Sequence, residues 1–250
     1  MDETISIKNN LTIAYQALAS MKFDNLTYTH LSARLPGKDS FYIYPFGFLY
    51  SEVTPSSLLQ VSFSGDVLEG EKEGYNPTGY ALHSAIYRNR PDINAIFHLH
   101  TTAGVAVSAM ECGLLPISQF ALHFYNRVSY QDYDSLVLDP HKQEEILKTI
   151  MGQDNKTIML RNHGTVTCGS TIQEAFFYTH HLEEACKVQC LALSSREKLI
   201  MPDPIICEKS CTQLLSFEES LGERDWKAIS RQFKVKDNSS ISYPLKLKAV

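Results

Sequence analysis

The sequence lacks a long apolar run, a basic leader and an excess of positive charge. No apolar stretch approaches the roughly 20 residues that a membrane-spanning helix needs, so we expect no membrane segment. The N-terminal segment MDETISIKNN is polar and acidic, which is not the basic-then-apolar order of a signal peptide. The net charge is −5 and the isoelectric point is near 6.0, so the charge balance does not favour nucleic acid as a partner.

Paired cysteines are also missing. Six cysteines are spread over 250 residues, and none of them forms the CxxC spacing of a zinc ribbon or a redox motif. Such a distribution is typical of reduced thiols and not of a disulfide scaffold. The sequence therefore predicts a cytoplasmic protein that binds neither nucleic acid nor a membrane.

What the sequence does contain is an alternation of helical and β-rich segments. Hydrophobic residues make up 44% of the chain, which is enough for one large core. From apolar spacings of three and four we expect helices over residues 4–21, 78–90, 101–113 and 170–195. From β-rich runs bounded by turn residues we expect strands within 26–34, 41–46, 58–70, 94–100 and 157–169. This alternation predicts an α/β fold around a mixed sheet.

The domain organisation follows from where this alternation ends. We find no linker or repeat that would divide residues 1–200, which we expect to form one domain. Residues 201–250 form a C-terminal extension that contains MPDP and ends in a polar stretch. Two alternatives stay open for it, a loose tail or a segment that docks on a neighbouring subunit.

The segment NAIFHLHTTAG, residues 94–104, places His98 and His100 in an otherwise apolar run. Side chains two residues apart on a strand face the same side, so the predicted strand brings both imidazoles together. Two neutral imidazoles are half of a metal site. His163, in LRNHGTV, is the best candidate for a third ligand because it precedes a glycine at a predicted strand–turn junction. Three histidines leave a divalent ion open positions, as in catalytic sites.

The alternative is that these histidines are ordinary core residues with satisfied hydrogen bonds. Six further histidines occur in the chain (positions 30, 83, 123, 141, 180 and 181), so composition alone does not select His163. A structural zinc site is disfavoured because three ligands lack the fourth protein ligand of such sites.

Three segments together resemble the class II aldolase/adducin family. They are HSAIYRNRPDINAIFHLHTTAGVAVSAMECGLLPIS, LRNHGTVTCG and EAFFYTHHLEEAC, and the resemblance runs from about residue 8 to residue 200. The family includes fuculose-phosphate aldolase and ribulose-phosphate 4-epimerase. The resemblance implies a three-layer α/β/α sandwich around a largely antiparallel central sheet, assembled as a homotetramer. It also implies that His98, His100 and His163 hold a divalent metal, zinc first and Fe²⁺, Mn²⁺ or Co²⁺ as alternatives.

One position departs from the family's aldolases in a way that affects the chemistry. In those enzymes a glutamate ahead of the first metal histidine serves as acid and base, and the matching residue here is Gly79. Glycine cannot transfer a proton, so the standard aldolase mechanism does not carry over. Glu71 and Glu73 lie nearby, but the stretch EGEKEG around them has the composition of a solvated loop.

His30, His83 and Tyr80 are the candidates to replace the missing carboxylate. His30, in YTHLSAR, stands where the family's sugar-phosphate enzymes have the asparagine of a GNLS loop. Pro77 and Thr78 stand in place of a pair of serines, and both changes remove small polar donors suited to phosphate. We therefore expect a small hydroxy-carbonyl substrate and not a phosphosugar. In the alternative interpretation, His83 is a core residue and Tyr80 a packing residue.

Two classes of function are compatible with these motifs, which favour the adducin-like branch of the family. The first and favoured one is a metal-dependent enzyme of the lyase or isomerase type, acting through an enediolate. Iron-dependent oxygen chemistry is a variant of it. The second is a non-catalytic oligomeric binding module of the adducin type. An enzyme needs a proton-transfer group near the metal, so the module is favoured if both His30 and His83 point away from His98.

Overall fold

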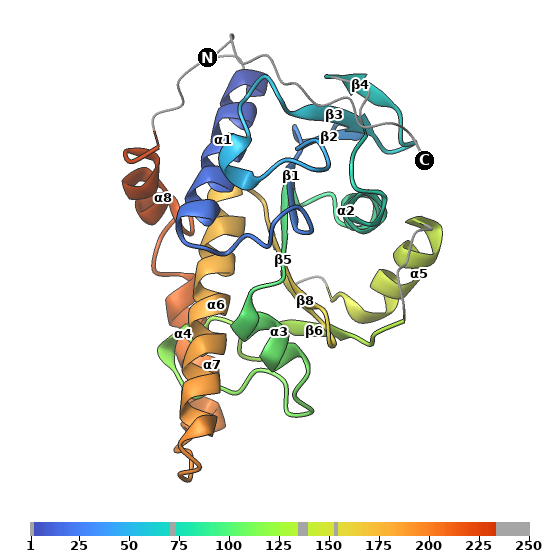
Figure 1. The fold of residues 1–250 in the computed structure, drawn as a ribbon. Helices are drawn as coiled ribbons and strands as arrows, with labels where there is room; N and C mark the ends of the chain where they lie inside the picture. Colours follow the sequence, from blue (N-terminus) through green and yellow to red (C-terminus); the bar gives the residue numbers. More distant parts are fainter. Residues whose placement is uncertain (1–2, 71–73, 135–139, 153–154, 234–250) are drawn as a thin grey trace.

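A single sheet organises the part of the chain that the computed structural model describes, namely residues 3–70, 74–134, 140–152 and 155–233 (Figure 1). Its strands lie in the order β4-β3-β2-β1-β5-β8-β7-β6. They are β1 (His30–Ala33), β2 (Ser40–Ile43), β3 (Leu59–Ser62), β4 (Val67–Glu69), β5 (Ala95–Leu99), β6 (Val128–Gln131), β7 (Thr157–Leu160) and β8 (Gly164–Gly169). Only β6 and β7 pair in parallel. The predicted α/β fold with a largely antiparallel sheet is confirmed.

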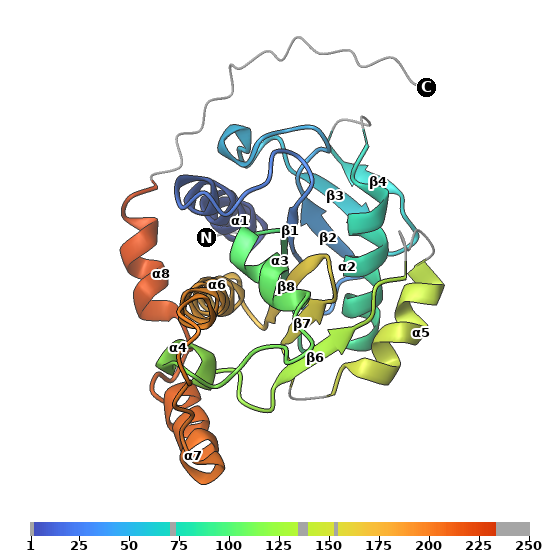
Figure 2. The same ribbon diagram turned by 60° about the horizontal axis from the view of Figure 1, so that its bottom comes forward.

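Helices lie on both sides of this sheet. They are α1 (Glu3–Ser20), α2 (Pro77–Asn89), α3 (Thr102–Ser108), α4 (Gln119–Leu122), α5 (Pro140–Ile150), α6 (Ile172–Ser194), α7 (Pro204–Leu215) and α8 (Glu223–Ser230), with a 3-10 turn η1 (Tyr50–Glu52). Figures 1 and 2 show α1 and α6 on one side and α2 and α5 on the other. Helix α4 packs on α6, and α7 packs on α4. Because of these outlying helices, the three-layer sandwich stays a prediction for the architecture as a whole.

The predicted helix over residues 101–113 is too long. Helix α3 ends at Ser108, and residues 109–113 form turns that close with a hydrogen bond from the Gly113 amide to the Met110 carbonyl. The guanidinium of Arg161, which precedes β8, donates to the Met110 carbonyl at 2.6 Å. Arg161, far along the chain, thus binds a carbonyl just after the end of α3.

The pairing of β1 with β5 sets which side chains meet on each face. In this antiparallel pair His30 lies opposite His98, and Leu31 lies opposite Phe97. Side chains alternate along a strand, so the two histidines share one face. Ser32 and His83 are hydrogen-bonded, which places helix α2 against that face. The register therefore places the imidazoles of His30 and His98, 68 residues apart in sequence, on one side of the sheet.

Part of the C-terminal extension packs on its own chain. The indole ring of Trp226 in α8 meets Phe176 of α6 edge to face, with ring centroids 5.4 Å apart. Its N–H donates to Oδ1 of Asn10 in α1 at 3.3 Å. Docking on a neighbouring subunit, and the domain boundary near residue 200, stay predictions. In the described part of the chain no helix has the length and apolar character for crossing a membrane.

Candidate metal centre

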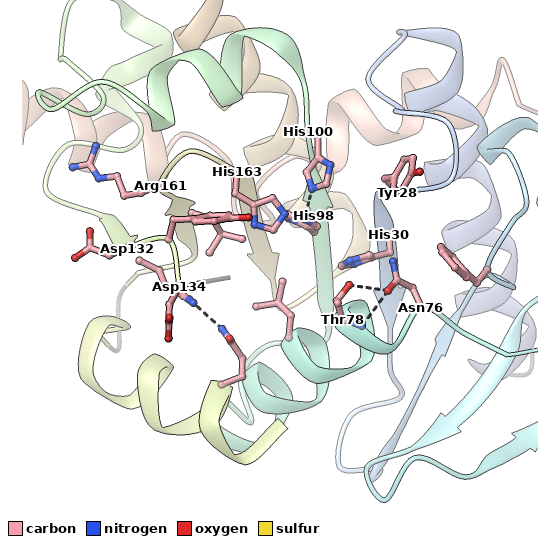
Figure 3. Close-up of a pocket in the computed structure, with 16 residues that line it drawn as sticks. Tyr28, His30, Asn76, Thr78, His98, His100, Asp132, Asp134, Arg161 and His163 are labelled. Atoms are coloured by element: carbon pink, nitrogen blue, oxygen red, sulfur yellow. Dashed lines mark hydrogen bonds between the residues drawn. The ribbon is translucent and has the colours of Figure 1, made fainter. Parts of the chain in front are cut away.

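Three histidine side chains converge at the end of β5, as Figure 3 shows. His98 is on β5, His100 follows the strand, and His163 lies in the turn between β7 and β8. One ligand nitrogen from each lies within 4.8 Å of the others. The Nε2 atoms of His98 and His100 are 2.7 Å apart, and the His163 ring centroid is 4.7 Å from that of His100. The structure brings together the three residues that the sequence suggested as ligands.

A backbone carbonyl on the neighbouring strand fixes the orientation of the His98 ring. Its Nδ1 lies 3.0 Å from the carbonyl oxygen of Thr165 on the neighbouring strand β8. A carbonyl only accepts, so Nδ1 carries the hydrogen and Nε2 keeps its lone pair, directed at His100. Histidines that ligate metals commonly donate their other ring N–H to a carbonyl in this way. His98 is therefore oriented as a ligand.

A tight turn places His163 beside the other two rings. Asn162 has φ of +59°, a left-handed conformation that asparagine tolerates better than most residues. The next glycine is required by space, since a Cβ at Gly164 would lie 2.4 Å from the carbonyl oxygen of Leu99 and 2.9 Å from the ring of His100. Only glycine lets the start of β8 approach the end of β5 so closely. The HG pair is thus what allows His163 to reach the site.

Burial favours the neutral form of all three imidazoles. Burial lowers the pKa of His98 well below its ordinary value, and neighbouring imidazoles, first that of His30, act in the same direction. Burial lowers the pKa of His100 to about 4, and burial also lowers the pKa of His163. Neutral imidazole is the form that binds metal. Three neutral nitrogen donors without a carboxylate fit a borderline divalent ion such as Zn²⁺, Fe²⁺ or Co²⁺.

The triad lies in a pocket of about 320 Å³, within the size range of small-molecule sites. It is lined by Tyr28, His30, Phe46, Asn76, Thr78, Leu82, His98, His100, Gln131, Asp132, Tyr133, Asp134, Gln143, Leu160, Arg161 and His163. Arg161 is the only lysine or arginine among these lining residues. Its guanidinium is held by the Met110 carbonyl and lies 4.3 Å from the ring centroid of Tyr130. Among the described lining residues, Arg161 is thus the one permanent cation that could meet a phosphate group, and part of its guanidinium is bonded to the protein.

His30 forms the opposite wall of the pocket, and Gly79 makes room for it. The rings of His30 and His98 have centroids 4.8 Å apart. A Cβ built at Gly79 would lie 2.8 Å from Cδ2 and 2.9 Å from Nε2 of His30, closer than real Cβ contacts come. The His30 ring thus occupies space that a side chain at position 79 would need. Positions 30 and 79 are therefore coupled by space, because the His30 ring and a side chain at position 79 exclude each other.

His83 reaches the site only through His30. It is fully buried in α2 and does not line the pocket. Its Nε2 lies 2.9 Å from Nδ1 of His30, and its Nδ1 contacts the hydroxyl of Ser32. His83 therefore supports His30 and touches no substrate directly.

Tyr80 is not brought to the triad. Its hydroxyl donates to the carbonyl of Phe63 at 2.6 Å, and its ring stacks on Phe41, away from the pocket-lining residues. This geometry does not favour the proton-transfer role predicted for Tyr80. Glu71 and Glu73 lie outside the described residues.

Several pocket residues had no clear signal in the sequence. Asn76 caps α2, accepting from the amide of Thr78 at 3.0 Å and from its hydroxyl at 2.7 Å, and both side chains also line the pocket. The Asn-Pro-Thr order is a helix-start signal, but it does not reveal a pocket wall. Asp132 and Asp134 follow β6, a strand absent from the predicted set.

Known proteins are similar to this chain in sequence and in fold. Residues 9–190 match the family described as "Class II Aldolase and Adducin N-terminal domain". Alpha-adducin of Rattus norvegicus is 42% identical over 204 residues, which are 79% of this chain but only 28% of that protein. An aldolase II superfamily protein from Pseudomonas syringae superposes with a TM-score of 0.84 at 35% identity, over 93% of each chain. An L-fuculose 1-phosphate aldolase from Glaciozyma antarctica gives 0.78 at 29% identity, over 92% of this chain and 90% of that one.

Proposed function

The chain belongs to the class II aldolase and adducin family, and we propose that within it this protein is a divalent-metal-dependent enzyme of the lyase or isomerase type. The observation that carries the proposal is the position of His30. This imidazole lies against the histidine triad in the same pocket, where an enzyme of this type needs a group that can give a hydrogen to substrate oxygen. A binding module has no need of such a group.

The triad supplies the metal-binding half of the proposed site. His98, His100 and His163 would hold the ion, with zinc as the first choice and Fe²⁺, Mn²⁺ or Co²⁺ as alternatives. A bound divalent ion supplies Lewis acidity that stabilises negative charge on a carbonyl oxygen. The three neutral ligands leave the full charge of the ion available to the substrate. Among the described residues, no fourth side chain joins the cluster, which leaves positions for substrate oxygens.

His30 supplies the hydrogen-donating half. It stands in the space that a side chain at position 79 would fill, beside the triad and in the same pocket. A substrate oxygen in the pocket beside the triad would lie close to the His30 ring. His83 is a positioning residue that holds the ring in place through Nδ1.

The substrate is proposed to be a small hydroxy-carbonyl compound without a phosphate. One guanidinium nitrogen of Arg161 donates to the Met110 carbonyl, and the hydroxyl of Thr78 is bonded to Asn76. Asp132 adds negative charge to the pocket wall, which disfavours a phosphate dianion. Asp134 is paired with Lys142 at 2.8 Å. The homotetramer that the family resemblance implies belongs to the same proposal, and light scattering of the purified protein tests it.

The second candidate is a non-catalytic oligomeric module of the adducin type. The observation in its favour is the 42% identity to alpha-adducin, which exceeds the 29% identity to the fuculose-phosphate aldolase. In this case metal binding at the triad would occur without turnover, or would not occur.

Metal analysis followed by a substrate screen separates the two candidates. The purified protein and a His98→Ala variant are incubated with zinc, iron, manganese or cobalt, desalted, and measured by elemental mass spectrometry. We expect about one ion per chain in the wild type and none in the variant. The loaded protein is then assayed for cleavage and epimerisation of unphosphorylated ketoses, hydroxy-aldehydes and hydroxy-acids beside their phosphate esters. Absence of metal under all four conditions would overturn the enzyme proposal.

A further inference from the structure

A chain of four buried polar side chains runs from the pocket into the core. The hydroxyls of Tyr87 and Ser32 are 2.8 Å apart, and the Ser32 hydroxyl lies 2.5 Å from Nδ1 of His83. Nε2 of His83 then lies 2.9 Å from Nδ1 of His30. None of the four residues is more than 2% exposed. Only His30, at the end of the chain, lines the pocket.

The inner end of the chain sets the direction of its hydrogen bonds. Among the described residues, the Tyr87 hydroxyl has the Ser32 hydroxyl as its only hydrogen-bond partner. Burial raises the pKa of Tyr87, so the phenol keeps its hydrogen. A buried donor without an acceptor is costly, about 1–3 kcal/mol, so Tyr87 donates to Ser32. The reverse direction would leave the phenol hydrogen without an acceptor.

This direction propagates along the chain, because each hydroxyl and each neutral imidazole has one hydrogen to give. Ser32 accepts from Tyr87 and donates to Nδ1 of His83. His83 then carries its hydrogen on Nε2 and donates to Nδ1 of His30. With Nδ1 accepting, His30 must carry its own hydrogen on Nε2, which makes no hydrogen bond to any of the described residues.

We propose that Tyr87, Ser32 and His83 lock His30 in the Nε2–H tautomer, so that His30 acts on the substrate as a hydrogen-bond donor to oxygen and not as a base. No member of the chain changes its charge in this role. The substrate part of this inference rests on the proposed function, whereas the tautomer does not.

Nitrogen-15 NMR of protein labelled at its histidine rings tests the inference without any assay of activity. Long-range proton–nitrogen spectra show which ring nitrogen of each neutral histidine carries the hydrogen. Signals are assigned with His30→Gln and His83→Gln, and spectra are recorded with and without zinc. We expect hydrogen on Nε2 in both His30 and His83. Hydrogen on Nδ1 of His30 would overturn the proposal, whether or not the protein binds metal or turns over a substrate.

Tyr87→Phe tests whether the inner end of the chain causes the lock. Without the phenol hydrogen, the Ser32 hydroxyl can accept from His83, so we expect a substantial Nδ1–H population at His30. Tyr178→Phe removes the hydroxyl of another buried tyrosine, outside the chain, and should leave the spectrum of His30 unchanged. A folded Tyr87→Phe protein with an unchanged tautomer would refute the lock. If Tyr87→Phe does not fold, Ser32→Ala breaks the same chain at its next member, with the same two outcomes.

Discussion

The two walls of the pocket differ in what holds their histidine rings. In the triad wall the backbone does this, with the Thr165 carbonyl against His98 and a turn that Gly164 permits at His163. In the wall opposite, His30 fits only because Gly79 lies 49 residues away in sequence and lacks a side chain, and His83 holds its ring from α2. Each residue of the first wall can be replaced by itself, whereas the side chains of the second wall pack as one unit. Substitutions in the first wall should therefore change metal affinity, and those in the second should change stability.

The largest effect is expected from His100→Ala in the triad wall. His100 is only partly buried, so its loss should affect metal binding more than folding. We expect metal affinity to fall by more than the ~10–100-fold that loss of an outer-shell partner costs. Zinc titration by calorimetry measures this, and His141→Ala, at an exposed histidine outside the pocket, is the control. Equal zinc affinity in the two variants would show that His100 is not a ligand.

Gly79→Ala should have the next largest effect. We expect it to lower the stability of the fold and to leave metal affinity unchanged. The added Cβ meets the His30 ring at less than 3 Å, so we expect a loss of about 1–3 kcal/mol in the free energy of unfolding. Chemical denaturation of the metal-free protein measures it. Gly152→Ala is the matched control, because a Cβ there meets nothing closer than 3.9 Å.

A double-mutant cycle then tests whether the second wall is one unit. In a His30→Ala background, the effect of Gly79→Ala should largely disappear because the colliding ring is gone. Additive effects of the two substitutions would contradict the interlocked wall.

His83→Phe should produce an intermediate effect on turnover. The ring keeps most of the volume but loses the hydrogen bonds to His30 and Ser32. We expect kcat to fall by roughly 10-fold, about 1.4 kcal/mol, while the metal content stays at the wild-type level. Once a substrate is found, steady-state kinetics beside elemental analysis check both quantities. Loss of metal in this variant would show that the triad and the wall of His30 and His83 are not independent.

The smallest effect is expected at Asn162. Alanine there must adopt the left-handed φ of +59°, at a cost of about 1 kcal/mol in the free energy of unfolding. Asn162→Gly should cost less because glycine has no Cβ. Thermal or chemical unfolding compares the two variants, and an equal loss in both would point to the asparagine side chain instead of the backbone.

The contrast between local patterns and contacts across the fold explains what the sequence could predict. The period of two along a strand was sufficient to bring His98 and His100 together. His163 was singled out by its glycine and by the family resemblance, since nine histidines made composition uninformative. The contact of His30 with Gly79 needs the register of β1 against β5 and the placement of α2, which no local pattern encodes. The end of α3 was missed for a similar reason, because Arg161 takes up the Met110 carbonyl from far along the chain.

The shared space of His30 and Gly79 also constrains how such a pocket can change over generations. A lineage that starts with a side chain at position 79 cannot gain the histidine at position 30 first, because its ring would collide with that side chain. If glycine comes first, the space beside position 30 opens before the histidine arrives. The order of the two steps is therefore set by volume, and a larger side chain at position 79 would require that the histidine is lost first.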